Sequence, residues 1–253
     1  MHKISIVIIT KNEEERILQT LESVKWCDEI VVVDSCSTDK TVDICKQYNN
    51  CKVYNQAFLG YGEQKQLAVG KASYDWVFSL DADEVVSEAL KNEIITILRQ
   101  PEIKAVGFYV PITLVFLNRI FKYGAENKFF HLRLFNKNES NFNTLSLHES
   151  VKIKGKTLKL KNEIYHYCYK DIHHYFVKFN TYTTLYKNAS LKKGKRASRL
   201  ETILLFPWEF IRQYFIRGNL FNGYAGFVWS AFSAFYVFVK YIKLFEANLK
   251  NNS

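Results

Sequence analysis

Two acidic side chains one residue apart follow an apolar run, and together they could hold a metal ion. Asp81 and Asp83 come after the run Trp76–Leu80. Side chains at positions i and i+2 of an extended segment point to the same side, so the two carboxylates would converge on one spot. Carboxylates that close repel each other unless a proton or a cation neutralises them. Mg²⁺ and Mn²⁺ bind such hard oxygen ligands together with substrate phosphates, so the pattern predicts a metal–diphosphate site with Asp81 and Asp83 as metal ligands.

The first hundred residues alternate between strand and helix patterns, which would place these acids at one edge of a sheet. Short apolar runs predict strands at 4–9, 29–34, 51–55 and 74–80. Apolar spacing and capping residues predict helices after Asn12, after Asp39, over 63–72 and over 87–99. Such alternation predicts an α/β fold with a mostly parallel sheet, whose ligands bind at the carboxyl ends of its strands. The loops 10–13, 34–39 and 81–84 would all lie on that edge.

Beyond residue 100 the pattern is looser. Further strands are predicted at 106–110, 129–136 and 164–169, and an exposed strand or hairpin at 152–161. Aromatic residues at helical spacing predict a helix over 172–189.

The last eighty residues combine positive charge with apolar length. Residues 187–200 contain six Lys and Arg and no acid, and 218–239 contain no charged residue between Arg217 and Lys240. The uncharged segment is long enough to span a bilayer, but polar residues and glycines dilute it. We expect a helix that lies in the membrane interface or packs beneath the N-terminal domain, beside cations that meet acidic lipids. A spanning helix and a helical hairpin buried in a dimer are the alternatives, so a homo-oligomer stays open.

Charge and cysteine content narrow the class of protein. Residues 1–100 contain 11 Lys and Arg against 16 Asp and Glu, whereas residues 101–253 contain 24 against 9. The basic second half indicates a polyanionic partner, for which an anionic membrane surface is expected. We expect no nucleic acid partner, because the sequence contains no helix-turn-helix or aromatic RNA-binding motif.

The five cysteines form no CxxC pair, which argues against a zinc site and is typical of a reduced cytoplasmic protein. The apolar run after Met1-His2-Lys3 is too short for a secretory signal and is read as the first strand.

Several motifs then fall in a known order. Ile9–Glu13, Val33–Asp39, Gln64–Gln66 and Ser79–Glu84 resemble, in order and spacing, the family 2 glycosyltransferases with the Rossmann-like GT-A fold. Four later motifs are similar to the bacterial lipopolysaccharide-core β-1,4-glucosyltransferase branch of that family. They are Arg133–Phe135, His148–Ser150, Asn222–Gly226 and Tyr241–Leu244.

The resemblance implies roles for particular residues. Thr10, Asn12 and Glu13 match the segment that lines the nucleotide base, and Asp34 matches an acid that contacts uracil. Lys65 falls where a basic residue lies near the nucleotide. Asp81 matches an acid near the ribose and the metal, and Asp83 matches the direct metal ligand. The chain departs from the family's pattern at two positions. Gln66 stands where asparagine is common, and Cys36 stands where glycine is common. The details of the nucleotide loops therefore stay open.

The same resemblance implies the catalytic groups of an inverting transfer. An acceptor hydroxyl needs a general base on the face opposite the leaving diphosphate. Glu149 falls on the family's His-Glu motif and is the expected base, with His148 orienting the acceptor or the diphosphate. Arg133 would pair with phosphate, since a guanidinium grips oxyanions in a bidentate way. Glu84 as the base, or as a partner of the metal, is the alternative, and Asp34 could instead cap the helix that follows it.

The resemblance implies a metal-assisted enzyme that moves a hexose, glucose being expected, from a UDP-sugar to an inner-core heptose of lipopolysaccharide or lipooligosaccharide. Such an enzyme would lie peripherally on the cytoplasmic face of the bacterial inner membrane. Residues 1–100 would form the nucleotide-sugar-binding half of the GT-A domain, residues 101–170 its acceptor-side half, and residues 171–253 a helical extension that associates with the membrane. The alternatives are a glycosyltransferase that acts on polyprenyl phosphate, capsule or peptide, and a non-catalytic basic membrane-binding module.

Overall fold

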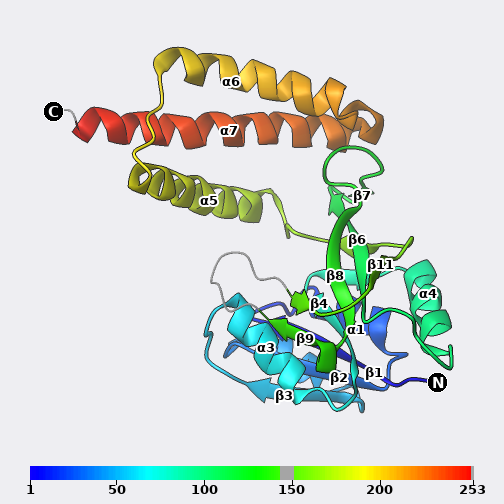
Figure 1. Cartoon of the computed structure of the whole chain (residues 1–253). Helices are drawn as coiled ribbons and strands as arrows, with labels where there is room; N and C mark the ends of the chain where they lie inside the picture. Colours follow the sequence, from blue (N-terminus) through cyan, green and yellow to red (C-terminus); the bar gives the residue numbers. More distant parts are fainter. Residues whose placement is uncertain (143–150, 252–253) are drawn as a thin grey trace. The chain divides into compact units, whose positions relative to one another are not determined.

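The computed structural model describes residues 1–142 and 151–251, and the chain divides into two compact units (Figure 1). The sheet unit consists of Met1–Thr113 and Lys128–His166. The helical unit consists of Leu114–Asn127 and Tyr167–Ser253.

Four parallel strands form the first part of the sheet unit, in the order β3-β2-β1-β4. They are β1 (Ile4–Thr10), β2 (Glu29–Asp34), β3 (Cys51–Asn55) and β4 (Trp76–Asp81), which confirms the four predicted strands. In the register of these strands Thr10 lies opposite Asp34, and Ile9 lies opposite Asp81. The carboxyl ends of β1, β2 and β4 therefore meet at one edge, and each end contributes a polar residue.

Helices cover both faces of this parallel sheet, which explains why its strands are continuous apolar runs. The helices are α1 (Ile17–Val24), α2 (Thr41–Cys45), α3 (Tyr61–Lys71) and α4 (Glu88–Leu98). The apolar sides of α1 and α4 share a core with Ile4, Ile6 and Ile8. Ala68 and Val69 of α3 pack on the opposite face.

The helix expected directly after Asn12 begins only at Ile17, so that prediction was wrong by four residues. Asn12 adopts a left-handed conformation with φ 55°, which a first helical turn does not allow. Its side-chain oxygen accepts a hydrogen bond from the backbone N–H of Thr38 at 2.8 Å. A bond between two loops has replaced the predicted cap.

The rest of the sheet is largely antiparallel, so the whole sheet is mixed. Strand β8 (Phe129–Asn136) lies antiparallel between β4 and β6 (Gly107–Phe116), and β12 (Ile164–His166) pairs antiparallel with β5 (Glu84–Val86). The hairpin considered for 152–161 is absent from the described part of the chain. Strand β10 (Val151–Ile153) pairs with β9 (Ser140–Phe142), whereas β11 (Thr157–Lys159) pairs parallel with β6.

The helical unit is built around one long helix. Helix α7 (Gly223–Asn251) lies between α5 (Ile172–Lys192) and α6 (Arg199–Ile211), as Figure 1 shows. A π-helical turn, η2 (Arg212–Ile216), and a 3₁₀ turn, η3 (Asn219–Asn222), connect α6 to α7. The core contains Phe116, Phe121, Tyr175 and Phe179, packed against the partly buried Trp229. The predicted helix over 172–189 is confirmed.

The uncharged segment 218–239 is not one separate helix. Gly218 and Gly223 have positive φ values of 76° and 66°, and the long helix begins only at Gly223. It then continues past Lys240 to Asn251. The stretch Asn219–Lys250 is the one described segment that is long and apolar enough to cross a membrane, by length and composition only.

A buried carboxylate ties the start of the parallel sheet together. Glu29 accepts hydrogen bonds from the hydroxyls of Ser5 and Ser73, both at 2.6 Å, and from the Lys52 ammonium at 2.8 Å. Burial alone would raise the pKa of Glu29. The bonds from Lys52, Ser5 and Ser73 outweigh it and lower the pKa from 4.5 to about 2.

We expect Glu29→Gln to lower the free energy of unfolding by about 2 kcal/mol near neutral pH. Because the folded-state pKa lies below the unfolded value, the stabilisation is complete above about pH 4.5 and is lost as the pH falls toward 2. Urea unfolding between pH 3 and pH 7 should show a weaker pH dependence for the variant than for the native chain. The exposed Glu102, changed to Gln, is the matched control, and equal slopes for all three proteins would contradict this role of Glu29.

Candidate active site at the carboxyl edge of the sheet

Two neighbouring loops are tied together at the carboxyl ends of β1 and β2. The backbone N–H of Asn12 donates to Ser37 Oγ, and the backbone N–H of Glu13 donates to Thr41 Oγ1, both at 2.8 Å. Cys36 adopts a left-handed conformation with φ 58°, which glycine adopts without strain. The loop expected to line a base therefore has a defined shape.

Asp34 lies at the end of β2 and is buried. Its carboxylate accepts hydrogen bonds from the backbone N–H of Ser37 at 2.8 Å and from the Ser37 hydroxyl. It does not cap α2. Asp39 accepts from the N–H of Thr41 at the start of that helix. The cap considered for Asp34 was therefore wrong, and Asp39 stabilises the start of α2 instead.

Asp81, at the end of β4, lies between two cations. Lys65 Nζ is 2.9 Å from Asp81 Oδ1, and Arg133 Nη2 is 2.9 Å from Asp81 Oδ2. Lys65 is held by α3, where the buried Gln64 donates to Ser35 Oγ at 3.0 Å and to the Gln56 carbonyl at 3.1 Å. Burial alone would raise the pKa of Asp81, but Arg133 and Lys65 hold it well below its ordinary range. Asp81 is therefore ionised.

Glu84 is completely buried beside this cluster. Arg133 Nη2 lies 2.6 Å from Glu84 Oε1, and Glu84 Oε2 accepts a hydrogen bond from the backbone N–H of Asp81 at 2.9 Å. Burial raises the pKa of Glu84, although the charge of Arg133 opposes that change. A buried carboxylate bonded in this way fixes the position of Arg133 and of the Asp81 backbone.

Asp83 lies in a turn, so the extended geometry expected for Asp81 and Asp83 was wrong. Strand β4 ends at Asp81, Ala82 and Asp83 form the turn, and β5 begins at Glu84. The Asp83 carboxylate lies 3.5 Å from Arg16 Nη1 and 3.3 Å from His166 Nε2. The two acids are thus approached by different basic side chains.

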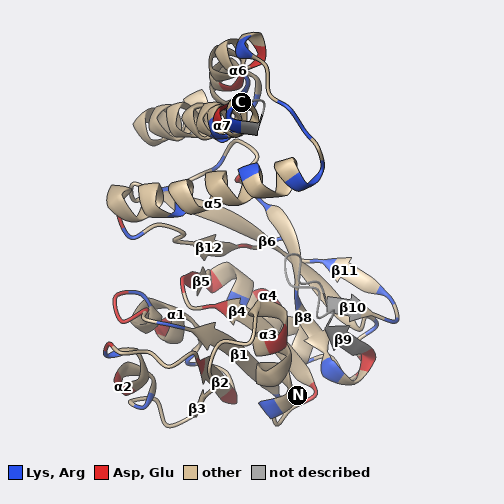
Figure 2. Cartoon of the chain, turned by 90° about the vertical axis from the view of Figure 1, so that its left-hand side faces the viewer, with Lys and Arg blue, Asp and Glu red and all other residues tan. Residues whose placement is uncertain are grey.

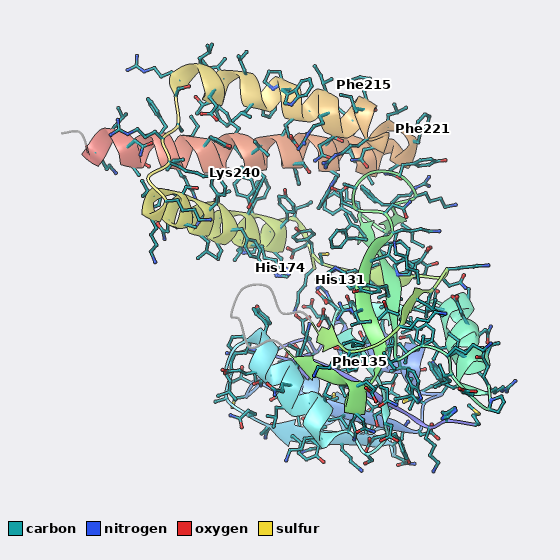
Figure 3. The ribbon with its side chains drawn as sticks, viewed as in Figure 1. His131, Phe135, His174, Phe215, Phe221 and Lys240 are labelled. Atoms are coloured by element: carbon teal, nitrogen blue, oxygen red, sulfur yellow. The ribbon has the colours of Figure 1, made fainter. Side chains whose placement is uncertain are left out.

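Arg16 and His166 were missed by reasoning from the sequence. Arg16 stands between an acidic run and α1, and its place in the sequence gives no sign that it reaches Asp83. His166 ends β12, whose pairing with β5 places it opposite Glu84. Because β5 and β12 are about eighty residues apart in the chain, no residue near His166 in the sequence indicates this pairing. Figure 3 shows a further histidine, His131, on β8, two positions before Arg133.

The carboxylates of Asp81 and Asp83 suit a divalent cation that would take its further ligands from a diphosphate and water. No group of three or more His, Cys, Asp or Glu able to hold a metal is found among residues 1–142 and 151–251. Asp81 and Asp83 offer two carboxylates, and Mg²⁺ commonly uses one or two besides substrate phosphates. Asp83 stands in the turn that follows Asp81, so both carboxylates belong to the same edge of the sheet.

The two predicted catalytic residues, His148 and Glu149, lie outside the described residues. Their assignments stay predictions. The other predicted site residues lie at one sheet edge and beside it: Lys65 is on α3, Arg133 is on β8, and Thr10, Asn12, Glu13, Asp34, Asp81 and Asp83 lie at the strand ends and in the loops that follow them.

Comparison with known proteins agrees with this arrangement. Residues 5–154, more than half of the chain, match the glycosyl transferase family 2. The chain belongs to this family, and it is a glycosyltransferase with the GT-A fold.

Individual relatives cover nearly the whole chain. A glycosyltransferase of Rickettsia typhi is 35% identical over 268 residues, covering 100% of this chain and 90% of the relative. The lipopolysaccharide core biosynthesis glycosyltransferase LpsC of Rhizobium meliloti is 29% identical, covering 89% of this chain and 85% of LpsC. The crystal structure of S. aureus TarS 1–349 in complex with UDP has a TM-score of 0.50 at 16% identity, over 98% of this chain and 92% of that chain. This last likeness shows the fold.

Proposed function

We propose that this glycosyltransferase moves a hexose, namely glucose, from a UDP-sugar to an inner-core heptose of lipopolysaccharide or lipooligosaccharide, with inversion. The observation that carries the proposal is the pair of carboxylates, Asp81 and Asp83, at the carboxyl edge of the parallel strands, with Lys65 and Arg133 beside them. An edge with both acids and cations can bind a diphosphate together with its counter-ion.

On the donor side, the loop formed by Thr10, Asn12 and Glu13 would line the base, and Asp34 would accept a hydrogen bond from the uracil imide N–H. Both loops are already ordered by the bonds of Ser37 and Thr41. The TarS structure that shares this fold holds UDP, which agrees with a uridine donor.

Around the diphosphate, Lys65 and Arg133 would neutralise phosphate oxygens as they are released from Asp81. Asp83, with Asp81, would hold a Mn²⁺ or Mg²⁺ ion, which when bound stabilises the negative charge of the leaving nucleoside diphosphate. Glu149 would remove the proton of the attacking acceptor hydroxyl, and His148 would orient the acceptor.

The lipopolysaccharide acceptor is supported by the similarity to LpsC over most of both chains. The basic composition of residues 101–253 suits a phosphorylated, lipid-anchored acceptor at the cytoplasmic face of the inner membrane. Residues 1–100 would then bind the donor, 101–170 would contribute to the acceptor side, and 171–253 would associate with the membrane.

Incubation of the full chain with a panel of UDP-sugars and a truncated lipopolysaccharide core, with and without Mn²⁺ or Mg²⁺, tests this function. We expect transfer from UDP-glucose to the core, formation of the β anomer, and loss of transfer in EDTA. Transfer to polyprenyl phosphate, with none to the core, would replace the proposed acceptor. Absence of both UDP binding and transfer would instead favour the non-catalytic membrane-binding module.

A further inference from the structure

Helix α6 and the turn η2 have polar residues on their buried side. Thr202, Glu209 and Gln213 are buried, and their spacing of seven and four residues places them on one face. Glu209 accepts hydrogen bonds from Gln213 Nε2 and from Arg212 Nη2, both at 2.8 Å. The inner side of this segment therefore combines these polar bonds with aromatic packing against α7, such as Phe206 on Phe238 and Phe210 on Phe227.

The opposite face of the same segment is apolar and exposed. Leu200 and Ile203 are 67% and 66% exposed, and Trp208 is 55% exposed. The exposed apolar residues of this surface, here called the α6 face, are Leu200, Ile203, Leu204, Trp208, Ile211 and Phe215. Figure 3 shows Phe215 and the exposed Phe221 at the end of the helical unit where α6 turns back into α7. Contiguous apolar surface of this kind marks a site of contact with a protein or a membrane.

Exposed cations precede the α6 face. Within eight positions the chain has five of them, Lys192, Lys193, Lys195, Arg196 and Arg199, and no acid lies between Asp171 and Glu201. Figure 2 shows Lys and Arg along the loop that leads from α5 to α6. Such a cluster attracts anionic lipid headgroups.

We propose that the α6 face binds an anionic lipid bilayer, with its apolar side chains at the boundary between headgroups and acyl chains. The cations at 192–199 contact the headgroups, and Trp208 lies at the interface, where its amphipathic ring is favoured. This changes the earlier expectation that 218–239 is the membrane-facing helix. Because α7 lies between α5 and α6, it supports the membrane-binding surface.

Charge favours a membrane over a second copy of the chain. Cations stand before the α6 face, and Arg212 and Arg217 stand at its other end. Two copies packed face to face in antiparallel fashion would place these basic ends against each other, whereas an anionic bilayer complements both ends. The proposal does not depend on which sugar is transferred.

Co-sedimentation of the full-length protein with vesicles tests the proposal, because its readout is independent of transfer. Phosphatidylcholine vesicles are compared with vesicles that also contain phosphatidylglycerol. We expect binding to the anionic vesicles that weakens with salt. The double variant Ile203→Asn, Trp208→Gln should weaken binding at least tenfold, and Lys192→Gln, Lys193→Gln, Lys195→Gln should remove the preference for anionic lipid.

The matched control is Val177→Asn, Leu185→Gln, which removes two exposed apolar side chains from α5 and should bind vesicles like the native chain. Circular dichroism and the melting temperature confirm that each variant is folded.

Equal binding by the α6 variant and the native chain would overturn the proposal, as would equal binding of the native chain to neutral vesicles. A dimer in analytical ultracentrifugation that the α6 variant dissociates, without vesicle binding, would assign the face to self-association. Native protein that resists extraction from membranes at alkaline pH would indicate a spanning helix instead.

Discussion

Replacing Asp83 with asparagine should lower kcat/KM for sugar transfer by about 10²–10³-fold, while the chain stays folded. Asparagine keeps the shape of the side chain but removes the negative charge that a divalent ion needs. The effect on stability should be small, because asparagine keeps a hydrogen-bonding oxygen and residue 83 lies in a turn rather than inside β4 or β5. Initial rates measured against Mn²⁺ and Mg²⁺ concentration, together with calorimetry of UDP binding, test the prediction.

Asp43→Asn is the matched control, since Asp43 is an exposed acid of α2 in the same unit. It should retain the rate and metal dependence of the native chain. If Asp83→Asn showed native turnover with an unchanged metal requirement, the assignment of Asp83 as a metal ligand would be refuted.

Replacing Arg133 with methionine should lower the free energy of unfolding by about 3–5 kcal/mol. Glu84 is completely buried, and Arg133 is the cation that contacts it at 2.6 Å, so the variant leaves a buried carboxylate without this compensating charge. Chemical denaturation of the variant and the native chain measures the difference. Adding Glu84→Gln to Arg133→Met should recover about 2 kcal/mol of the loss, because the buried group can then no longer be charged.

The loss in the Arg133→Met variant should depend on pH with a definite sign. Burial raises the pKa of Glu84, and Arg133 opposes that change, so removing Arg133 raises the pKa further and lets protonation relieve the buried charge. The loss in free energy of unfolding caused by Arg133→Met should therefore be smaller at pH 5 than at pH 8. Both pH values lie above the range in which Glu29 titrates. The exposed Arg99, changed to Met, is the control and should change stability little at either pH. A deficit that is equal for Arg99→Met and Arg133→Met would contradict the role given to the buried pair.

The sheet edge could be predicted from the sequence because its signals are local. Apolar runs ending in Thr10, Asp34 and Asp81 define three strands, and parallel pairing brings their carboxyl ends together. The motif order then indicated the family, which the match over residues 5–154 shows.

The details that were missed depend on contacts across long sequence separations. His166 reaches Asp83 because β12 pairs with β5, and Arg16 reaches it because α1 packs on this turn, where Thr20 donates to the Ala82 carbonyl. The late start of α1 has a similar cause, because Asn12 bonds to a loop twenty-six residues away. In the tail, hydropathy along the chain does not reveal the α6 face, because its exposed apolar residues alternate with polar ones that are buried.

The bonded loops after β1 and β2 have a consequence for how a nucleotide would be received. Asn12, Glu13 and Ser37 are held by hydrogen bonds between these loops themselves. The loops are preorganised, so little conformational freedom of this segment would remain to be frozen on association. More of the interaction energy would then be left to distinguish one base from another.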